Sequence, residues 1–100
     1  MPKVRWLGPA LSDLAEIKAF YEEKEAGLGQ RLIEEILGIE CQLTDFPLTG
    51  RVSKNLRPEH RELIRAPHLV VYRVEFEVVK IVAVIDCRRD FSAAWLSKKR

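Results

Sequence analysis

Apolar and polar residues follow a helical period in the first half of the chain. From Ala10 to Ala26 the apolar side chains recur at steps of three and four, which predicts one amphipathic helix. Its apolar stripe is Leu14, Ile17, Phe20 and Tyr21, and its polar face holds Asp13, Glu16, Glu22, Glu23 and Lys24.

A second amphipathic helix is predicted from Gly29 to Phe46. Its apolar set is Leu32, Ile33, Ile36, Leu37, Ile39, Leu43 and Phe46, and Cys41 falls among these positions, where we expect a buried thiol. Pro47 ends this helix, because the residue before proline is pushed out of the α region. The short link Gly27-Leu28-Gly29 therefore predicts an antiparallel helical hairpin.

The second half of the chain follows a strand pattern. Strands are predicted over Arg61 to Ala66, Leu69 to Phe76 and Val78 to Cys87, with turns at Pro67-His68 and at Glu77. A further short strand is predicted at the N-terminus, from Lys3 to Leu7. The polar stretch from Leu48 to Glu59 predicts an irregular, basic connection.

These elements give the order β-α-α-β-β-β and one domain over residues 1–100. Strands that cluster after helices are typical of the α+β class. We expect an antiparallel helical hairpin on one face of a mostly antiparallel twisted sheet of four strands. On this prediction the arginines gather on the opposite, concave face.

Composition narrows the function classes. No apolar run is long enough to span a bilayer, and no secretory signal is recognised, so the expected location is the cytoplasm. The only cysteines, Cys41 and Cys87, fit reduced thiols. Residues 1–50 carry a charge of −4 and residues 51–100 a charge of +6. This asymmetry favours a polyanionic or acidic partner over a chance distribution.

Arginines are the strongest candidates for binding phosphate. Arg61 and Arg65 stand four apart on one predicted strand and so point to one face, and Arg73 is expected across the hairpin from them. The last strand ends in Arg88 and Arg89. A guanidinium binds phosphate bidentately and stays charged at any working pH. The alternative is a solvated face with ion pairs to Glu62, Glu75 and Asp90.

Other candidate chemistry is sparse. His60 and His68 are expected to be surface histidines, and Phe91 and Trp95 either stack on bases or, as we prefer, fill a groove on the chain's own core. No metal site is predicted, and no glycine-rich phosphate loop follows a strand. No cofactor is expected.

Four stretches, taken in order, resemble the RelE/ParE toxin superfamily. They are Asp13-Leu14-x-x-Ile17-x-x-x-Tyr21, Leu43-x-x-Phe46-Pro47-x-x-Gly50-Arg51, Val71-Tyr72-Arg73-Val74 and Val82-x-x-Ile85-Asp86-x-Arg88-Arg89-Asp90. The resemblance runs from about Leu11 to Asp90. It implies the toxin of a type II toxin–antitoxin system, held inactive by a cognate antitoxin.

The resemblance leaves three functions open. A ParE-like toxin poisons DNA gyrase without chemistry of its own, and the Pro47-x-x-Gly50-Arg51 ending favours this branch. A RelE-like toxin cuts messenger RNA on the ribosome, and here Arg65, Arg73 and Arg88 would surround the scissile phosphate. The third possibility is a degenerate interaction module. Many relatives have a histidine where this chain has Asp86. RelE-like ribonucleases often have a tyrosine or histidine near the C-terminus, where this chain has Phe91 and Trp95.

The resemblance also implies contact residues. Arg51, Arg61 and Arg89 are expected to bind phosphate or the target, and Trp6, Leu28 and Trp95 to be covered by the antitoxin. The alternative for these three apolar residues is a place in the chain's own core.

Overall fold

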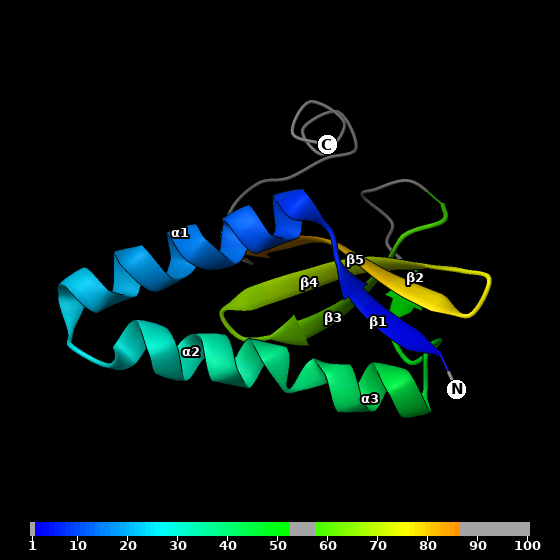
Figure 1. Cartoon of the computed structure of the whole chain (residues 1–100), viewed down its shortest axis with the longest axis horizontal. Coiled ribbons are helices and arrows are strands. Elements are labelled where there is room, and N and C mark those ends of the chain that lie inside the picture. Colours follow the sequence, from blue (N-terminus) through cyan, green and yellow to red (C-terminus); the bar gives the residue numbers. More distant parts are fainter. Residues whose placement is uncertain (1, 53–57, 87–100) are drawn as a thin grey trace.

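The sheet is built from strands at both ends of the chain. In this computed structural model, which describes residues 2–52 and 58–86, five strands lie in the order β1-β5-β4-β3-β2 (Figure 1). The strands are β1 (Lys3–Trp6), β2 (Arg51–Val52), β3 (Arg61–Arg65), β4 (His68–Glu75) and β5 (Val78–Asp86). β1 runs parallel to β5, and the other neighbours are antiparallel. The predicted α+β class and element order are confirmed.

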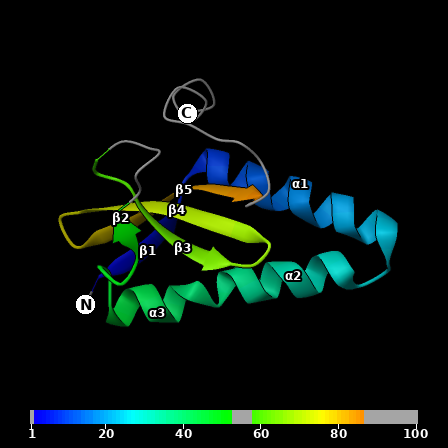
Figure 2. The ribbon, with the colours of Figure 1, turned by 180° about the vertical axis from the view of Figure 1, so that it is seen from behind.

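Three helices cover one face of this sheet. They are α1 (Gly8–Lys24), α2 (Leu28–Leu37) and α3 (Ile39–Asp45), and the turn between α1 and α2 lies at the far left of Figure 1. Seen from behind in Figure 2, α1 and the α2–α3 pair again flank the sheet as the two arms of a hairpin. The main core lies between the helices and the sheet and includes Ala10, Leu14, Ile33, Ile36, Ile39, Leu43, Val70, Tyr72, Val79 and Ile81.

The predicted single helix from Gly29 to Phe46 is wrong, because the structure divides it at Gly38. Glycine has the lowest helix propensity of any residue except proline, so a helix is most easily interrupted there. Three expectations of burial built on one continuous stripe are wrong as well. Leu37, Cys41 and Phe46 are exposed.

The connection from Leu48 to Glu59 was expected to be irregular, yet it contains β2. Arg51 and Val52 pair with Glu62 and Arg61 of β3, which makes β2 an edge strand. A strand of two residues has no alternation for a sequence pattern to reveal, so only the pairing identifies it.

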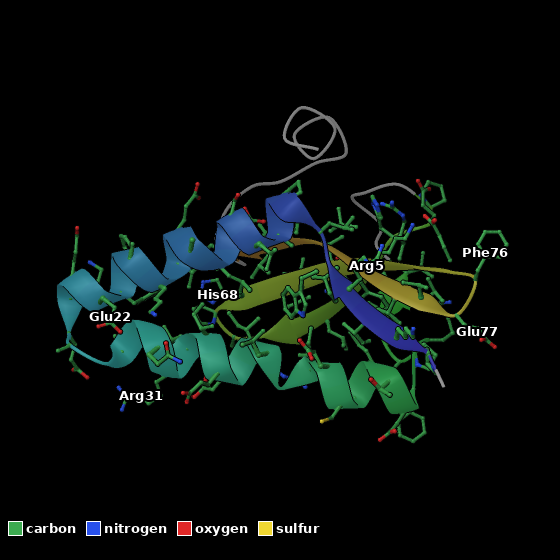
Figure 3. All side chains as sticks on the ribbon, in the orientation of Figure 1. Arg5, Glu22, Arg31, His68, Phe76 and Glu77 are labelled. Atoms are coloured by element: carbon green, nitrogen blue, oxygen red, sulfur yellow. The ribbon has the colours of Figure 1, made fainter. Side chains whose placement is uncertain are left out.

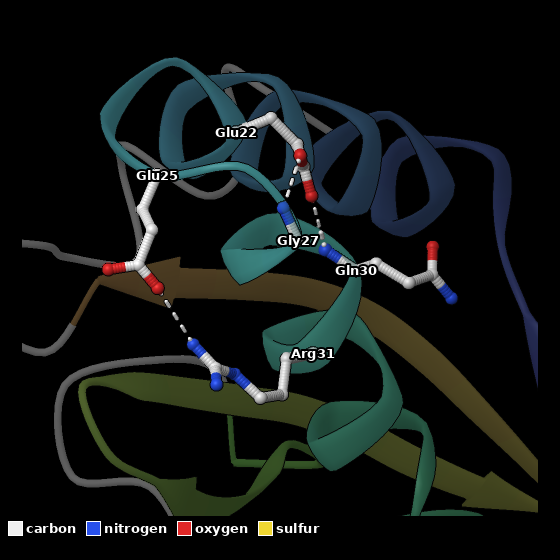
Figure 4. Close-up of polar contacts among 5 residues, drawn as sticks. All are labelled: Glu22, Glu25, Gly27, Gln30 and Arg31. Atoms are coloured by element: carbon white, nitrogen blue, oxygen red, sulfur yellow. Dashed lines mark hydrogen bonds and ion pairs between the residues drawn. The ribbon is translucent and has the colours of Figure 1, made fainter.

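A glutamate on α1 organises the turn between the helices (Figure 4). One oxygen of the Glu22 carboxylate accepts a hydrogen bond from the Gly27 N–H at 2.9 Å, and the other accepts one from the Gln30 N–H at 2.9 Å. These two backbone hydrogen bonds hold the pKa of Glu22 below its usual range. The carboxylate thus satisfies N–H groups at the start of α2 that have no partner within the helix. Gly27 adopts a φ of 85°, in the left-handed region that glycine tolerates best.

Asp13 ties α1 to the sheet. It was expected on the polar face of its helix, but it is only 2% exposed, and its Oδ2 accepts a hydrogen bond from the Val84 N–H at 2.9 Å. β1 pairs with β5 only as far as Ile81, so Val84 lies beyond the end of that parallel pairing. The carboxylate of α1 takes the place that a strand carbonyl would otherwise fill.

Phe20 also departs from its predicted place. It was assigned to the apolar stripe of α1, but it is half exposed and packs edge-to-face on Tyr21, with centroids 5.0 Å apart. The Lys24 ammonium lies 4.5 Å from the Phe20 ring centroid, within cation–π range. None of the described helices is long and apolar enough to cross a membrane.

Candidate functional site

Two of the candidate arginines lie on the helix side of the sheet. Arg61 and Arg65 flank Leu63 on β3, and Leu63 packs against the main core beneath the helices. The Arg61 guanidinium donates to the carbonyl of Gly50 at 2.8 Å, and Arg65 donates to the side-chain oxygen of Gln42 on α3. Both guanidinium groups are therefore engaged in joining parts of the fold.

Arg73 lies on the opposite face, which we call the outer face: the side of the sheet turned away from the helices. In the β3–β4 register Arg61 stands opposite Tyr72, and Tyr72 belongs to the main core. Because side chains alternate along a strand, Arg73 must point the other way. The expectation that Arg61, Arg65 and Arg73 share one face is wrong, since the real register is offset by one residue from the one that expectation required.

The Arg73 guanidinium is paired on the outer face. Its Nε donates to Glu75 two residues along β4, and Lys80 of β5 donates to the other Glu75 oxygen at 3.0 Å. The hydrogen bond from Lys80, followed by that from Arg73, holds the pKa of Glu75 below its usual range. Glu75 therefore stays ionised and partly neutralises both cations.

Arg51 and Glu62 form a second outer-face pair. Arg51 Nε lies 2.6 Å from Glu62 Oε1, with the Glu62 side chain almost buried and the Arg51 side chain exposed. Glu62 stands opposite Arg51 in the β2–β3 register. The Arg73–Glu75 pair matches the ion-pair alternative considered for the candidate phosphate binders. Glu62, the other described carboxylate named there, pairs instead with Arg51.

Tyr72 connects the sheet to the segment before β2. Its hydroxyl accepts a hydrogen bond from the Gly50 N–H at 2.7 Å, and burial is the main cause that raises its pKa. A Cβ atom on Gly50 would lie 2.6 Å from this hydroxyl, so only glycine fits so close to the tyrosine. The bond therefore places Leu48–Gly50 against β4.

Replacing this hydroxyl tests its structural role. Tyr72→Phe is expected to lower the free energy of unfolding by about 1–2 kcal/mol, because the buried Gly50 N–H loses its acceptor. Urea denaturation measures the loss. Tyr21→Phe is the matched control, since the Tyr21 hydroxyl makes no hydrogen bond with the described residues, and equal losses in the two variants would contradict the role assigned to Tyr72.

Both histidines are buried, so the expectation of surface histidines is wrong. His60 and His68 are less than a twentieth exposed. His68 begins β4, lies opposite Asp86 in the register with β5, and meets the Tyr21 ring edge-to-face at 6.0 Å (Figure 3). This position between α1 and the sheet makes His68 part of the packed interior.

The predicted partner-contact residues have different surroundings. The Trp6 indole N–H donates to Glu40 of α3 at 2.6 Å, and the ring packs half-buried against the main core. Leu28 is half-buried at the start of α2. Arg88, Arg89 and Trp95 lie outside the described residues. Contact of these residues with a partner stays a prediction.

No group of metal-binding side chains occurs in residues 2–52 and 58–86. Sequence reasoning missed Arg5, which lies on the outer face of β1, and the exposure of Phe76 in the β4–β5 turn. The alternation in Lys3–Trp6 could have indicated that Arg5 points away from the core, but not which strand would lie beside it.

The fold also occurs in solved structures of toxin–antitoxin systems. The chain is similar to a protein of the chromosomal ParDE toxin–antitoxin system from P. aeruginosa, with a TM-score of 0.70 and 21% identity over 86% of this chain and 96% of that one. It is also similar to a chain of the toxin–antitoxin complex RelBE2 from Mycobacterium tuberculosis, with a TM-score of 0.61 and 25% identity over 86% of this chain and 99% of the other.

The sequence assigns the chain to a family. The model of the ParE toxin family, toxins of the type II toxin–antitoxin system parDE, matches residues 4–91. The chain therefore belongs to the ParE toxin family, and the resemblance to the RelE/ParE superfamily is confirmed. Comparison with curated proteins gives no match.

Proposed function

We propose that this protein is a toxin that inhibits DNA gyrase by binding to it and that a cognate antitoxin neutralises it. Membership of the ParE toxin family supports the proposal, and the two similar solved structures come from a toxin–antitoxin system and a toxin–antitoxin complex. Fold alone does not distinguish a gyrase inhibitor from a ribonuclease, because both activities occur on related scaffolds.

The division of the arginines between two faces is the observation that favours binding over RNA cleavage. A ribonuclease needs positive charge converging on one phosphate, together with groups that accept and donate protons. Arg65 is bound to Gln42 on the helix side, whereas Arg73 is bound to Glu75 on the outer face. These two members of the predicted catalytic set therefore do not converge on one phosphate.

Purified gyrase and translating ribosomes, each incubated with the purified protein, provide the test. We expect loss of supercoiling of a relaxed plasmid at protein concentrations that leave messenger RNA intact on the ribosome. Adding the product of the neighbouring antitoxin gene should restore supercoiling.

Cut messenger RNA with unimpaired supercoiling would overturn the proposal in favour of a ribonuclease. In that case Arg65→Gln and Arg73→Gln, which alter opposite faces of the sheet, would show which face holds the scissile phosphate. No effect in either assay, and none on bacterial growth, would instead indicate a degenerate interaction module.

A further inference from the structure

Three cationic side chains form a row across three neighbouring strands of the outer face. In the sheet register Arg5 of β1 lies opposite Lys80 of β5, and Lys80 lies opposite Arg73 of β4. The neighbours of these residues along each strand pack into the main core under the helices; they are Val4, Trp6, Val79, Ile81, Tyr72 and Val74. By strand alternation the three cations therefore share the outer face, and we call them the cation row.

The cation row is unfavourable for the isolated fold. Like charges directly opposite each other on a sheet repel and destabilise it. Glu75 offsets this at one end, because it accepts hydrogen bonds from both Arg73 and Lys80. Arg5, at the other end, is exposed and has no carboxylate contact among the described residues, so the row keeps an excess of positive charge.

An exposed aromatic ring lies at the end of the sheet where β1 begins, close to the cation row. Phe76, in the turn between β4 and β5, is 98% exposed and projects from the tip of that hairpin (Figure 3). Phe76 and Glu77 both have positive φ, at 48° and 65°, where residues other than glycine, asparagine and aspartate are strained. The Lys3 N–H donates to the Glu77 carbonyl at 3.0 Å, which fastens β1 to this turn.

We propose that the cation row and Phe76 form a docking surface for an acidic protein segment. If the proposed function holds, this segment belongs to the antitoxin. Aromatic and arginine side chains together are typical of the residues that dominate protein–protein binding energy. Arg73 and Lys80 each donate a hydrogen bond to the Glu75 carboxylate, which supports carboxylates as the chemical group that the row binds.

Acidic residues on and beside the surface favour a peptide over a nucleic acid. Glu75 lies beside the row, hydrogen-bonded to Arg73 and Lys80, and Glu77 follows Phe76 in the turn. A continuous phosphate backbone would be repelled by both of these negative charges. A peptide can instead place its carboxylates only at the cation row, above all at Arg5, and an apolar side chain on Phe76.

Fluorescence anisotropy with three labelled probes tests the proposal on the full-length protein. The probes are an oligoglutamate peptide, an oligoglutamine peptide and single-stranded oligothymidylate. We expect the oligoglutamate peptide to bind most tightly of the three probes, and we expect its affinity to fall as salt is added. Arg5→Gln should weaken its binding about fivefold, because one rim cation is lost from the row.

Arg31→Gln is the control of equal charge. Arg31 is an exposed arginine on α2, paired with Glu25 at 3.2 Å, so its loss changes the net charge equally but leaves the outer face intact. Its effect should stay below about twofold. The thermal unfolding curve of each variant shows that it is folded.

Three results would overturn the docking surface: no binding of oligoglutamate at low ionic strength, equal weakening by Arg5→Gln and Arg31→Gln, or tighter binding of oligothymidylate. Since this assay contains no gyrase, its failure leaves the gyrase result unchanged. Failure to inhibit gyrase would likewise leave the measured peptide affinity in place and remove only the identification of the acidic segment with an antitoxin.

Discussion

Gly29→Ala is expected to lower the free energy of unfolding by about 3 kcal/mol or more, because there is no room for a methyl group between α1 and α2. A Cβ atom at this position would lie 2.3 Å from the Lys18 carbonyl oxygen and 2.7 Å from Glu22 Cγ. The first of these atoms belongs to the backbone of α1 and cannot rotate away as a side chain does. The two helices would have to separate, which disturbs the Glu22 hydrogen bonds to Gly27 and Gln30.

Urea denaturation followed by circular dichroism measures this loss. Gly8→Ala is the matched control, since Gly8 also belongs to a helix but a Cβ atom there would meet nothing within 4 Å. It should change stability by less than about 1 kcal/mol. If the Gly29 variant proved as stable as the Gly8 variant, the close contact between α1 and α2 would be disproved.

Asp13→Ala is expected to lower the free energy of unfolding by about 2–3 kcal/mol, because the buried Val84 N–H loses its side-chain acceptor. Asp13 is 2% exposed, and its bond to Val84 joins α1 to β5. The effect should concentrate at that edge of the sheet. We therefore expect faster amide hydrogen exchange at Val84 than the global loss of stability alone explains.

Two variants on the same helix distinguish hydrogen bonding from helix propensity. Asp13→Asn keeps a side-chain oxygen acceptor and should retain most of the stability that the alanine variant loses. Glu16→Ala alters an exposed acidic residue and should be nearly neutral. A loss in Glu16→Ala as large as that in Asp13→Ala would attribute the effect to the helix and not to Val84.

Family membership and the proposed docking surface depend on different features of this chain. The ParE toxin match depends on the pattern of the whole domain, from residue 4 to residue 91. The proposed docking surface depends on the pairing of β1 with β5, which brings Arg5 beside Lys80. Substitution of Arg5 therefore tests the proposed docking surface while leaving the domain pattern behind the family match in place.

Much of the secondary structure was determined locally by the sequence. The strand predicted at Leu69 to Phe76 is β4 at His68–Glu75, and the turn at Glu77 is present between β4 and β5. The apolar period predicted α1, and Pro47 follows the end of α3 at Asp45 within two residues. These features depend on the conformational preferences of a few neighbouring residues, which a sequence pattern records directly.

Only the tertiary structure decided which side chains meet. The parallel pairing of β1 with β5 joins segments more than seventy residues apart, and no local pattern specifies it. A register offset of one residue places Arg73 on the opposite face from Arg61 and Arg65, because side chains alternate along a strand. The helical pattern predicts Asp13 at the surface, but in the fold its carboxylate is buried and accepts a hydrogen bond from the Val84 N–H of β5. The sequence alone thus determined the elements and the family resemblance, whereas non-local pairing determined the surface that the cations form.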